Sequence, residues 1–299
     1  MPVKYIQRED DEKLKVKAYA KVNLALDVVR KRDDGYHELD MIMAPITLHD
    51  LIYIDRINKG IEITSNTYRM PTDERNIMYQ VAKILIERYH LHAGVKIHIY
   101  KHIPTQAGLA GGSADGAAVL RAMNQMFRLN LSLETLASIG KEVGADIPFC
   151  IYQQMALVRG IGEKLEFIEH QFNCYLLLVK PKKGVPTKKS FGMLDLKTAV
   201  HPPILKMKEA IENNDYQGVV EHLGNTLEAP SLDIVPDIQL IKKEMLELGF
   251  DGALMSGSGS CVFGLTKDQK ILESGYVYFQ NKYNFVRKTE ILQEEEEKY

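Results

Sequence analysis

"AGLAGGSADGAAVL", residues 107–120, is the stretch on which the fold depends. Its first ten residues include four glycines, and its end has the Ala/Val/Leu pattern typical of a helix. Gly108, Gly111 and Gly112 allow the backbone to approach a bulky ligand, and Ser113 is placed to cap the helix that follows. The first amides of such a helix, together with its dipole, favour an anion such as a phosphate chain. A glycine-rich turn that only lets the helix pack closely on a sheet would use the same residues, so both interpretations stay open.

This loop fits neither of the two common glycine-rich nucleotide signatures. A P-loop requires a lysine directly after its second glycine, and no lysine follows Gly112. The dinucleotide fingerprint requires a different glycine spacing inside a βαβ unit. The loop can therefore bind phosphate only through backbone amides and a helix dipole. A cation must come from elsewhere in the chain, and Lys21 is the predicted source.

Length, charge and cysteine usage limit the class of protein. The chain of 299 residues predicts two domains, and its formal net charge of -2 predicts no global attraction to nucleic acid or to a membrane. The longest strongly apolar run, at 175–179, is far too short to span a membrane, and residues 1–15 are too charged for a secretory signal. Cys150, Cys174 and Cys261 lie in apolar surroundings, which favours buried thiols in a reducing compartment. We expect a cytoplasmic protein.

Hydrophobic periodicity predicts strands mixed with helices along the chain. Residues 14–28 alternate with period 2, which predicts one strand, or two broken by a bend, with Lys21 and Asn23 on a shared face. Further strands are expected at 39–57, 95–103, 173–181, 252–257, 261–266, 276–280 and 285–291, and helices at 73–90, 132–143, 203–214, 215–224 and 236–248. This mixture predicts an α/β or α+β protein with a first domain at residues 1–165 and a second at residues 166–299.

A second glycine-rich segment, MSGSGSC at residues 255–261, lies between two short strand-like runs. Gly257 and Gly259 allow backbone amides to converge on an anion. A tight hairpin without any ligand would also use these glycines. The presence of two such loops in one chain favours a shared role in anion binding.

Two polar sites complete the candidates from the residues alone. Asp146, in GADIPFC (144–150), precedes an Ile-Pro pair that is expected to keep the backbone out of helical geometry, and a carboxylate there can accept a proton from a hydroxyl nucleophile. An aspartate that only closes a turn is the alternative. Lys21 can offset phosphate charge or lower the pKa of a hydroxyl, whereas an exposed strand lysine would simply be solvated.

Six motifs follow one another in order: AKVNLAL (20–26), GYHELDMI (35–42), IPTQAGLAGGSADGAAVLRAMN (103–124), GADIPFC (144–150), GIGEKLE (160–166) and GALMSGSGSCVFGL (252–265). Together they resemble the small-molecule kinase superfamily named for galactokinase, homoserine kinase, mevalonate kinase and phosphomevalonate kinase. The resemblance covers nearly the whole chain from about Leu14. It implies an N-terminal ATP-binding domain, a C-terminal ferredoxin-like domain and an active site in the cleft between them.

Within that superfamily the motifs are similar to the members that phosphorylate the C2 hydroxyl of a cytidine diphosphate-linked methylerythritol, in the non-mevalonate route to isoprenoid precursors. The resemblance implies ATP and Mg2+ as cofactors, with Lys21 and Asp146 as the catalytic residues. It implies a nucleotide loop made of Pro104, Ala107, Gly108, Leu109, Ala110, Gly111, Gly112 and Ser113, with Ser113 also approaching Mg2+. It implies a substrate site made of Asn23, Tyr36, His37, Thr187, Phe191, Gly257 and Gly259.

The chemistry of three of these side chains suits a cytosine base. The ring of Tyr36 can stack on the base, His37 can bond its polar edge, and Phe191 can form a second aromatic wall. The chain departs from the family pattern at Tyr19, at Gly116 and at Ser260-Cys261, where related enzymes have proline, alanine and Pro-Thr. The last departure is expected to loosen the segment 255–261.

Two alternative functions stay open at this point. A kinase of the same superfamily acting on homoserine or mevalonate would retain Lys21, Asp146 and the glycine loop but would not need Tyr36 and His37. A regulator that binds ATP without turnover would not need Lys21 and Asp146. We expect a small-molecule substrate, no nucleic-acid or membrane partner, and a monomer or homodimer.

Overall fold

The computed structural model describes residues 6–10 and 13–293. The chain divides into two compact units, each assembled from separate segments. The first unit comprises the residues up to Ala20, His49–Thr105 and Ala110–Gln153, and the second comprises Lys21–Leu48, Gln106–Leu109 and the residues from Gln154 onward. Two long strands, β2 (Lys13–Lys31) and β3 (His37–Ile57), contribute residues to both units. The mixed α/β class expected from the sequence is confirmed.

The first unit contains one sheet and the helices that cover it. Besides its parts of β2 and β3, this sheet includes β1 (Ile6–Asp10), β4 (Ile61–Ser65) and β5 (Gly94–Tyr100), in the order β1-β2-β3-β5-β4. Strand β5 pairs antiparallel with β3 and parallel with β4. In the register Ile52 lies opposite Ile99 and Ile54 opposite Ile97, and these four side chains are fully buried.

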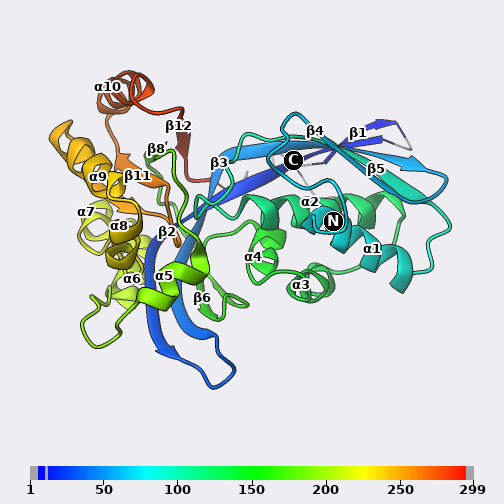
Figure 1. The fold of residues 1–299 in the computed structure, drawn as a ribbon, viewed down its shortest axis with the longest axis horizontal. Coiled ribbons are helices and arrows are strands. Elements are labelled where there is room, and N and C mark those ends of the chain that lie inside the picture. The colour runs from blue at the N-terminus through cyan, green and yellow to red at the C-terminus, as the bar shows by residue number, and fades with distance from the viewer. Residues whose placement is uncertain (1–5, 11–12, 294–299) are drawn as a thin grey trace. The chain divides into compact units, whose positions relative to one another are not determined.

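Four helices lie on one side of this sheet (Figure 1): α1 (Ile77–Arg88), α2 (Gly111–Met126), α3 (Leu133–Lys141) and α4 (Ile147–Tyr152). Side-chain caps explain where two of them begin, because Asn76 accepts from the amide of Met78 and Ser132 accepts from that of Thr135. Helix α1 packs against α2 at Gly116. A Cβ there would lie 2.6 Å from Ile77, so the glycine that departs from the family pattern fits its neighbour.

The second unit has short strands beside β2 and β3 and a separate four-stranded sheet. The short strands are β6 (Ala156–Gly160), β7 (Lys164–Phe167) and β9 (Gly224–Asn225). The separate sheet is antiparallel, and its strands lie in the order β10 (Gly252–Met255), β11 (Val262–Thr266), β8 (Tyr175–Lys180) and β12 (Phe285–Glu290). The helices of the second unit are α5 (Thr187–Met193), α6 (Ile204–Glu212), α7 (Tyr216–Glu221), α8 (Glu228–Ile234), α9 (Asp237–Glu247) and α10 (Gln269–Gln280).

Of the two alternatives for residues 14–28, the single strand is correct, because β2 is continuous. One expectation about local structure needs correction. Residues 276–280, expected as a strand because they are aromatic and β-branched, belong to helix α10, whose buried face is formed by Leu272, Gly275 and Phe279. The basic segment after β8 contains helix α5, which the sequence did not indicate. The three cysteines are buried thiols, as expected.

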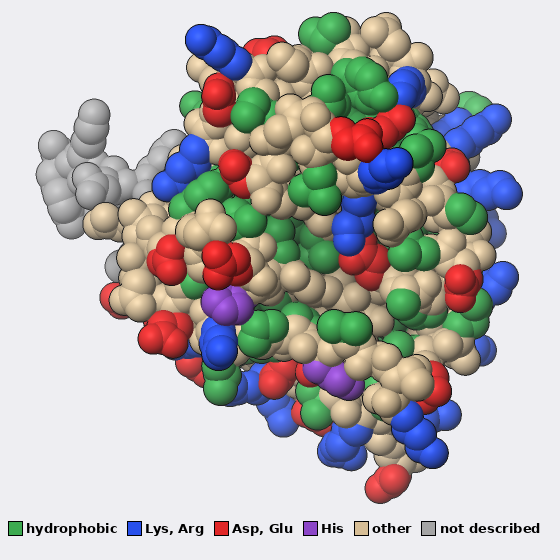
Figure 2. All heavy atoms as spheres, turned by 90° about the vertical axis from the view of Figure 1, so that its left-hand side faces the viewer, with side chains coloured by type: hydrophobic (Ala, Val, Ile, Leu, Met, Phe, Trp, Pro, Cys, Tyr) green, Lys and Arg blue, Asp and Glu red, His purple; other side chains and the backbone are tan. Residues whose placement is uncertain are grey.

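Charged side chains of both signs are distributed over the surface. On the face drawn in Figure 2, basic and acidic side chains are interspersed, and apolar side chains lie between them. This distribution agrees with a formal net charge of -2. Within the described part of the chain, no helix combines the length and the apolar character that crossing a membrane requires.

Candidate active site

The glycine-rich loop before α2, residues 104–113, is called the first glycine loop here. Its helix begins at Gly111, after Ala110 in the left-handed conformation with φ 55°. The expectation that Ser113 caps this helix is wrong, because Gly111 and Gly112 already adopt helical geometry and Ser113 lies inside the first turn. The first intrahelical bond runs from the amide of Ala114 to the carbonyl of Ala110, at 2.9 Å. The amides of residues 111–113 therefore precede the hydrogen-bonded helix and are suited to an anion.

Two glycines of this helix terminus also allow close packing. A Cβ on Gly111 would lie 2.9 Å from the side chain of Ile103, and one on Gly112 would lie 3.3 Å from Ile77. In the middle of the loop, the side chains of Ala107 and Leu109 are buried. Only the backbone of these two residues is then available to a ligand. The packing interpretation and the phosphate interpretation are therefore compatible.

Asp146 lies directly before helix α4 in the first unit. It has helical backbone angles, φ -83° and ψ -10°, and Pro148 lies in the first turn of the helix. The expectation that the Ile-Pro pair prevents helical geometry is wrong, because proline is tolerated where a helix amide needs no partner. The Asp146 side chain makes no capping hydrogen bond. This carboxylate is thus not used to close the turn.

Helix α4 is anchored to α2, which places Asp146 near the start of α2. Arg121 of α2 is fully buried and donates to the carbonyls of Cys150 and Ile151, at 2.6 and 3.1 Å, near the last turn of α4. At the other end of α4, a Cβ on Gly144 would lie 3.8 Å from the hydroxyl of Ser113. The segment that carries Asp146 therefore lies beside the first turn of α2.

In the second unit, Lys21 and Asn23 are buried side chains of β2. Their exposed fractions are 4% and 0%, which excludes the simply solvated lysine that the strand pattern allowed. The Lys21 ammonium donates to the Asn23 side-chain oxygen at 2.6 Å and to the carbonyl of Gly108 at 2.9 Å. A Cβ on Gly257 would lie 3.3 Å from the same ammonium. Lys21 therefore bonds to the first glycine-rich segment and lies beside the second.

Residues 255–261, called the second glycine loop here, connect β10 to β11 as a hairpin. Its glycines require the left-handed region, with φ 55° at Gly257 and 89° at Gly259. Two backbone bonds join it to the first glycine loop: Ser260 donates to Gln106, and Cys261 donates to Ala107 at 3.2 Å. The prediction of a hairpin is correct for the path of the chain. Through these two bonds, the second glycine loop also supports the first glycine loop.

Ser256 is the residue of this region that the sequence analysis missed. Its hydroxyl is fully buried, donates to the Gly108 carbonyl at 3.0 Å and accepts from the amide of Asn23 at 3.3 Å. One hydroxyl thus links β2 to both glycine loops. The only signal in the sequence is its position next to Gly257.

Ser260 and Cys261, the departure from the family pattern, are both anchored in the structure. The Ser260 hydroxyl donates to the Lys183 carbonyl at 2.6 Å. Cys261 is fully buried, and this burial raises the pKa of its thiol to about 12. These anchors give no support to the expected loosening of the loop.

Tyr36, His37 and Phe191 all belong to the second unit, and two of their rings are in contact. The Tyr36 side chain is 61% exposed at the turn before β3, where its amide donates to Asp34 at 3.1 Å. The rings of His37 and Phe191 lie 4.9 Å apart between centroids, tilted by 32°. Partial burial and the charge of Lys31 lower the pKa of His37, which favours a neutral imidazole that both donates and accepts.

Thr187 belongs to the second unit and lies next to the second glycine loop. Its hydroxyl lies 2.8 Å from that of Ser258. Buried Ser231 of α8 donates to the Ser258 carbonyl at 3.3 Å. Helices α5 and α8 therefore hold the tip of the loop between Gly257 and Gly259.

The close approach of the two loops predicts a severe effect of Gly108→Ala. A Cβ would lie 1.9 Å from the Ser256 carbonyl oxygen, and φ is +74°. We expect a loss of about 2–4 kcal/mol in the free energy of unfolding, from both the clash and the left-handed conformation. Gly60→Ala is the control, because φ is +87° there and nothing lies within 4 Å of the added Cβ. Urea unfolding followed by circular dichroism measures both, and equal losses would contradict the close approach.

Two family models match the chain. The model of the GHMP kinases N terminal domain matches residues 76–154, and the model of the GHMP kinases C terminal matches residues 207–284. The chain belongs to the GHMP kinase family, which confirms the resemblance drawn from the six motifs. It is accordingly a kinase, a transferase that uses ATP.

Two individual relatives are similar to the chain over most of its length. The 4-diphosphocytidyl-2-C-methyl-D-erythritol kinase of Bacillus subtilis is 45% identical over 261 residues, covering 87% of this chain and 90% of the relative. The enzyme of the same name from Bacillus cytotoxicus is 46% identical over 254 residues, covering 85% and 88%.

Solved structures show the same fold. A crystal structure of 4-(cytidine 5'-diphospho)-2C-methyl-D-erythritol kinase superposes with a TM-score of 0.81 at 28% identity, over 94% of this chain and all of that one. Homoserine kinase from Cytophaga hutchinsonii gives a TM-score of 0.77 at 20% identity, with 96% of each chain covered. At that identity the second match concerns the fold alone.

Proposed function

We propose that the protein transfers the γ-phosphoryl group of ATP to the C2 hydroxyl of 4-diphosphocytidyl-2-C-methyl-D-erythritol, giving the 2-phosphate and ADP. The relatives of that name, 45% identical over most of the chain, support the reaction. The observation that carries the choice of acceptor is the ring pair of His37 and Phe191, with the exposed Tyr36 next to His37 in the chain. A planar base can stack on aromatic rings of this kind, whereas homoserine and mevalonate have no aromatic ring.

Backbone amides and oxygen donors of this chain suit the phosphates of ATP and a Mg2+ ion. The amides of residues 111–113 and the dipole of α2 attract the phosphates. The Ser113 hydroxyl and the Asp146 carboxylate are oxygen donors of the kind that Mg2+ prefers, and Asp146 is not used as a helix cap. The donor set therefore fits this ion, which when bound neutralises charge on the β- and γ-phosphates.

Lys21 and Asp146 have the chemistry that the transfer step requires. We assign to Asp146 the proton of the C2 hydroxyl, which it accepts or orients as the oxygen attacks phosphorus. We assign to Lys21 the charge of the developing alkoxide or of the γ-phosphate. The bonds of its ammonium to Gly108 and Asn23 fix its position before substrate binds, and preorganised charge of this kind lowers the barrier most.

The cytosine assignment predicts the effect of Tyr36→Ala. Loss of one stacking ring is expected to raise KM for the cytidine substrate by about 1–3 kcal/mol, or roughly 5- to 150-fold, with KM for ATP unchanged. Steady-state kinetics with each substrate varied in turn measures this. Tyr68→Ala is the control, because Tyr68 is 92% exposed and belongs to the first unit. An unchanged KM for the cytidine substrate would remove Tyr36 from the base site.

One assay distinguishes this function from its alternatives. ADP release is coupled to NADH oxidation, with the cytidine substrate, homoserine and mevalonate offered in parallel. We expect turnover with the cytidine substrate alone. Preference for homoserine or mevalonate would assign another acceptor, and ATP binding without turnover on any of them would indicate a regulator.

We also propose a setting for the enzyme: the cytoplasm, as a monomer or homodimer without a nucleic-acid partner. Three buried thiols suit a reducing compartment. The nearly neutral net charge gives no general attraction to nucleic acid.

A further inference from the structure

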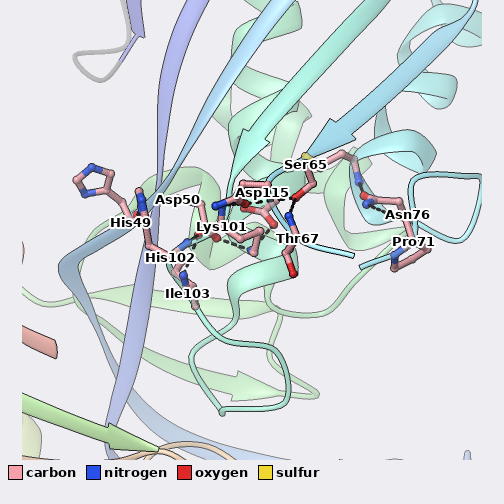
Figure 3. Close-up of polar contacts among 12 residues, drawn as sticks. His49, Asp50, Ser65, Thr67, Pro71, Asn76, Lys101, His102, Ile103 and Asp115 are labelled. Atoms are coloured by element: carbon pink, nitrogen blue, oxygen red, sulfur yellow. Dashed lines mark hydrogen bonds and ion pairs between the residues drawn. The ribbon is translucent and has the colours of Figure 1, made fainter. Parts of the chain in front are cut away.

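Three charged side chains form a buried cluster near Ile103, the residue before the first glycine loop (Figure 3). The Lys101 ammonium, just after β5, forms ion pairs with Asp50 of β3 and with Asp115 of α2, the latter at 2.7 Å. The side chains of Asp50, Lys101 and Asp115 are exposed by only 0%, 9% and 5%. All three belong to the first unit, and none of them is among the residues assigned above to ATP or to the acceptor.

The cluster joins the two ends of the first glycine loop. At its entry, Asp50 accepts from the backbone amides of His102 and Ile103, the latter at 2.8 Å. At its exit, Asp115 lies in the second turn of α2, directly after the amides that precede the hydrogen-bonded helix. Lys101 connects the two carboxylates. Burying these three charges costs free energy unless the contacts between them are maintained. The cluster therefore holds the two ends of the loop at a fixed distance from each other.

The ammonium also lies close to the helix start itself. A Cβ on Gly111 would be 3.4 Å from the Lys101 nitrogen and 2.9 Å from the Ile103 side chain. Lys101 and Ile103 therefore pack closely against the residue at which α2 begins. The amides that suit the phosphates are those of this residue and its two successors.

We propose that Asp50, Lys101 and Asp115 are positioning residues for ATP, which hold the entry and exit of the first glycine loop so that its amides converge on the phosphates. This inference rests on the proposed function, since it deepens the role of the loop in ATP binding. A P-loop lysine binds the phosphate directly. Lys101 instead stays paired with Asp50 and Asp115, so it supports the loop as a fixed cation and is not a ligand for the phosphate.

Burial and the neighbouring charges act on the groups of the cluster in opposite directions. Burial raises the pKa of Asp115, with the charge of Lys101 opposing this shift and Asp50 adding to it. Burial acts on Lys101 in the lowering direction, but the two carboxylates outweigh it, so the pKa of Lys101 is raised and the ammonium is retained. One oxygen of Asp115 is buried without a hydrogen-bond partner among the described residues, which suits a proton there.

The surroundings of Asp115 contain few other titratable groups. Beside it, Gly116 faces Ile77 and Val81 of α1 and Ile147 of α4, all apolar. On the strand side, His102 adjoins the cluster, and its ring lies 2.9 Å from the carbonyl of His49. Asp50 and Asp115 are therefore the acidic groups of the described residues that face the Lys101 ammonium.

The test measures the Kd of MgATP by calorimetry without acceptor, for the full-length parent and three variants. Asp115→Ala removes the partner of Lys101 and is expected to weaken binding about tenfold at pH 7. Asp115→Asn retains an acceptor for the Lys101 ammonium, so it is expected to bind within about twofold of the parent. Glu142→Ala is the control, because Glu142 pairs with Arg88 on the surface of the same unit. It is expected to bind as the parent does.

Rescue by the conservative variant separates positioning from a purely structural role. Thermal unfolding shows which variants retain the fold, and we expect folded Asp115→Ala to lose affinity while Asp115→Asn, which retains an acceptor for Lys101, keeps it. Parental affinity of folded Asp115→Ala, or an equal loss in Asp115→Asn, would overturn the inference. If Asp115→Ala does not fold, an unaltered Kd of folded Asp50→Asn, which removes a charge facing Lys101, would overturn it. Failure of the parent to bind MgATP would instead contradict the proposed function.

Discussion

Asp146→Asn is expected to lower kcat by roughly 10²- to 10⁴-fold while leaving the melting temperature within about 2 °C of the parent value. The reason for the first effect is that asparagine cannot accept the proton of the attacking hydroxyl. The reason for the second is that Asp146 makes no capping hydrogen bond to α4, so the fold does not depend on its charge. Single-turnover kinetics gives the rate of the transfer step, and thermal denaturation gives the stability.

The same substitution at a true helix cap is the matched control. Asp215 caps α7 by accepting from the amide of Gly218 at 3.0 Å, and asparagine caps nearly as well. Asp215→Asn should leave both kcat and the melting temperature unchanged. Activity of Asp146→Asn within a few-fold of the parent would remove Asp146 from the mechanism.

Lys21→Met should lower kcat by roughly 10²- to 10³-fold, because a preorganised charge at the transferring group is lost. It should also reduce the free energy of unfolding by about 1–3 kcal/mol, since the buried oxygen of Asn23 loses its donor. The Gly108 carbonyl retains the hydroxyl of Ser256, which limits the structural damage. The two effects are measured separately, as kcat on the folded fraction and as urea unfolding.

Lys164→Met provides the comparison for Lys21. Lys164 is an exposed residue of strand β7 in the second unit, so neither kcat nor stability should change appreciably. If Lys21→Met lost stability but retained parental kcat, Lys21 would be a structural residue that holds the two glycine loops, and the transfer step would need another cation.

Much of the fold was predictable because local patterns and tertiary packing agree. Helices α1 and α3 have apolar stripes and side-chain caps at Asn76 and Ser132. The prediction failed for 276–280, where aromatic and β-branched residues suggested a strand. There the cap at Asp268 and the buried positions of Leu272 and Gly275 indicate a helix, and those signals lie outside the five-residue window.

The sequence indicated which chain segments form the candidate site, but not the bonds that their residues make. Their glycines and charges are visible in the sequence, but the assignment of Ser113 as a cap was wrong because two glycines before it can be helical. The role of Ser256 depends on a hydrogen bond to Gly108, a residue remote in the chain. The cluster of Asp50, Lys101 and Asp115 likewise combines residues from the inside of β3, the end of β5 and helix α2, which no periodicity reveals.

The division of β2 and β3 between the two units has a consequence for protein engineering. A single cut after residue 165 would separate Lys21–Leu48 and Gln106–Leu109 from the rest of the second unit. The N-terminal fragment would contain the first unit together with pieces of the second, and the C-terminal fragment would contain an incomplete second unit. Exchange of halves between two members of this family would therefore have to transplant at least three segments at once, and a split-protein reporter would need its break inside a surface turn rather than at the midpoint of the chain.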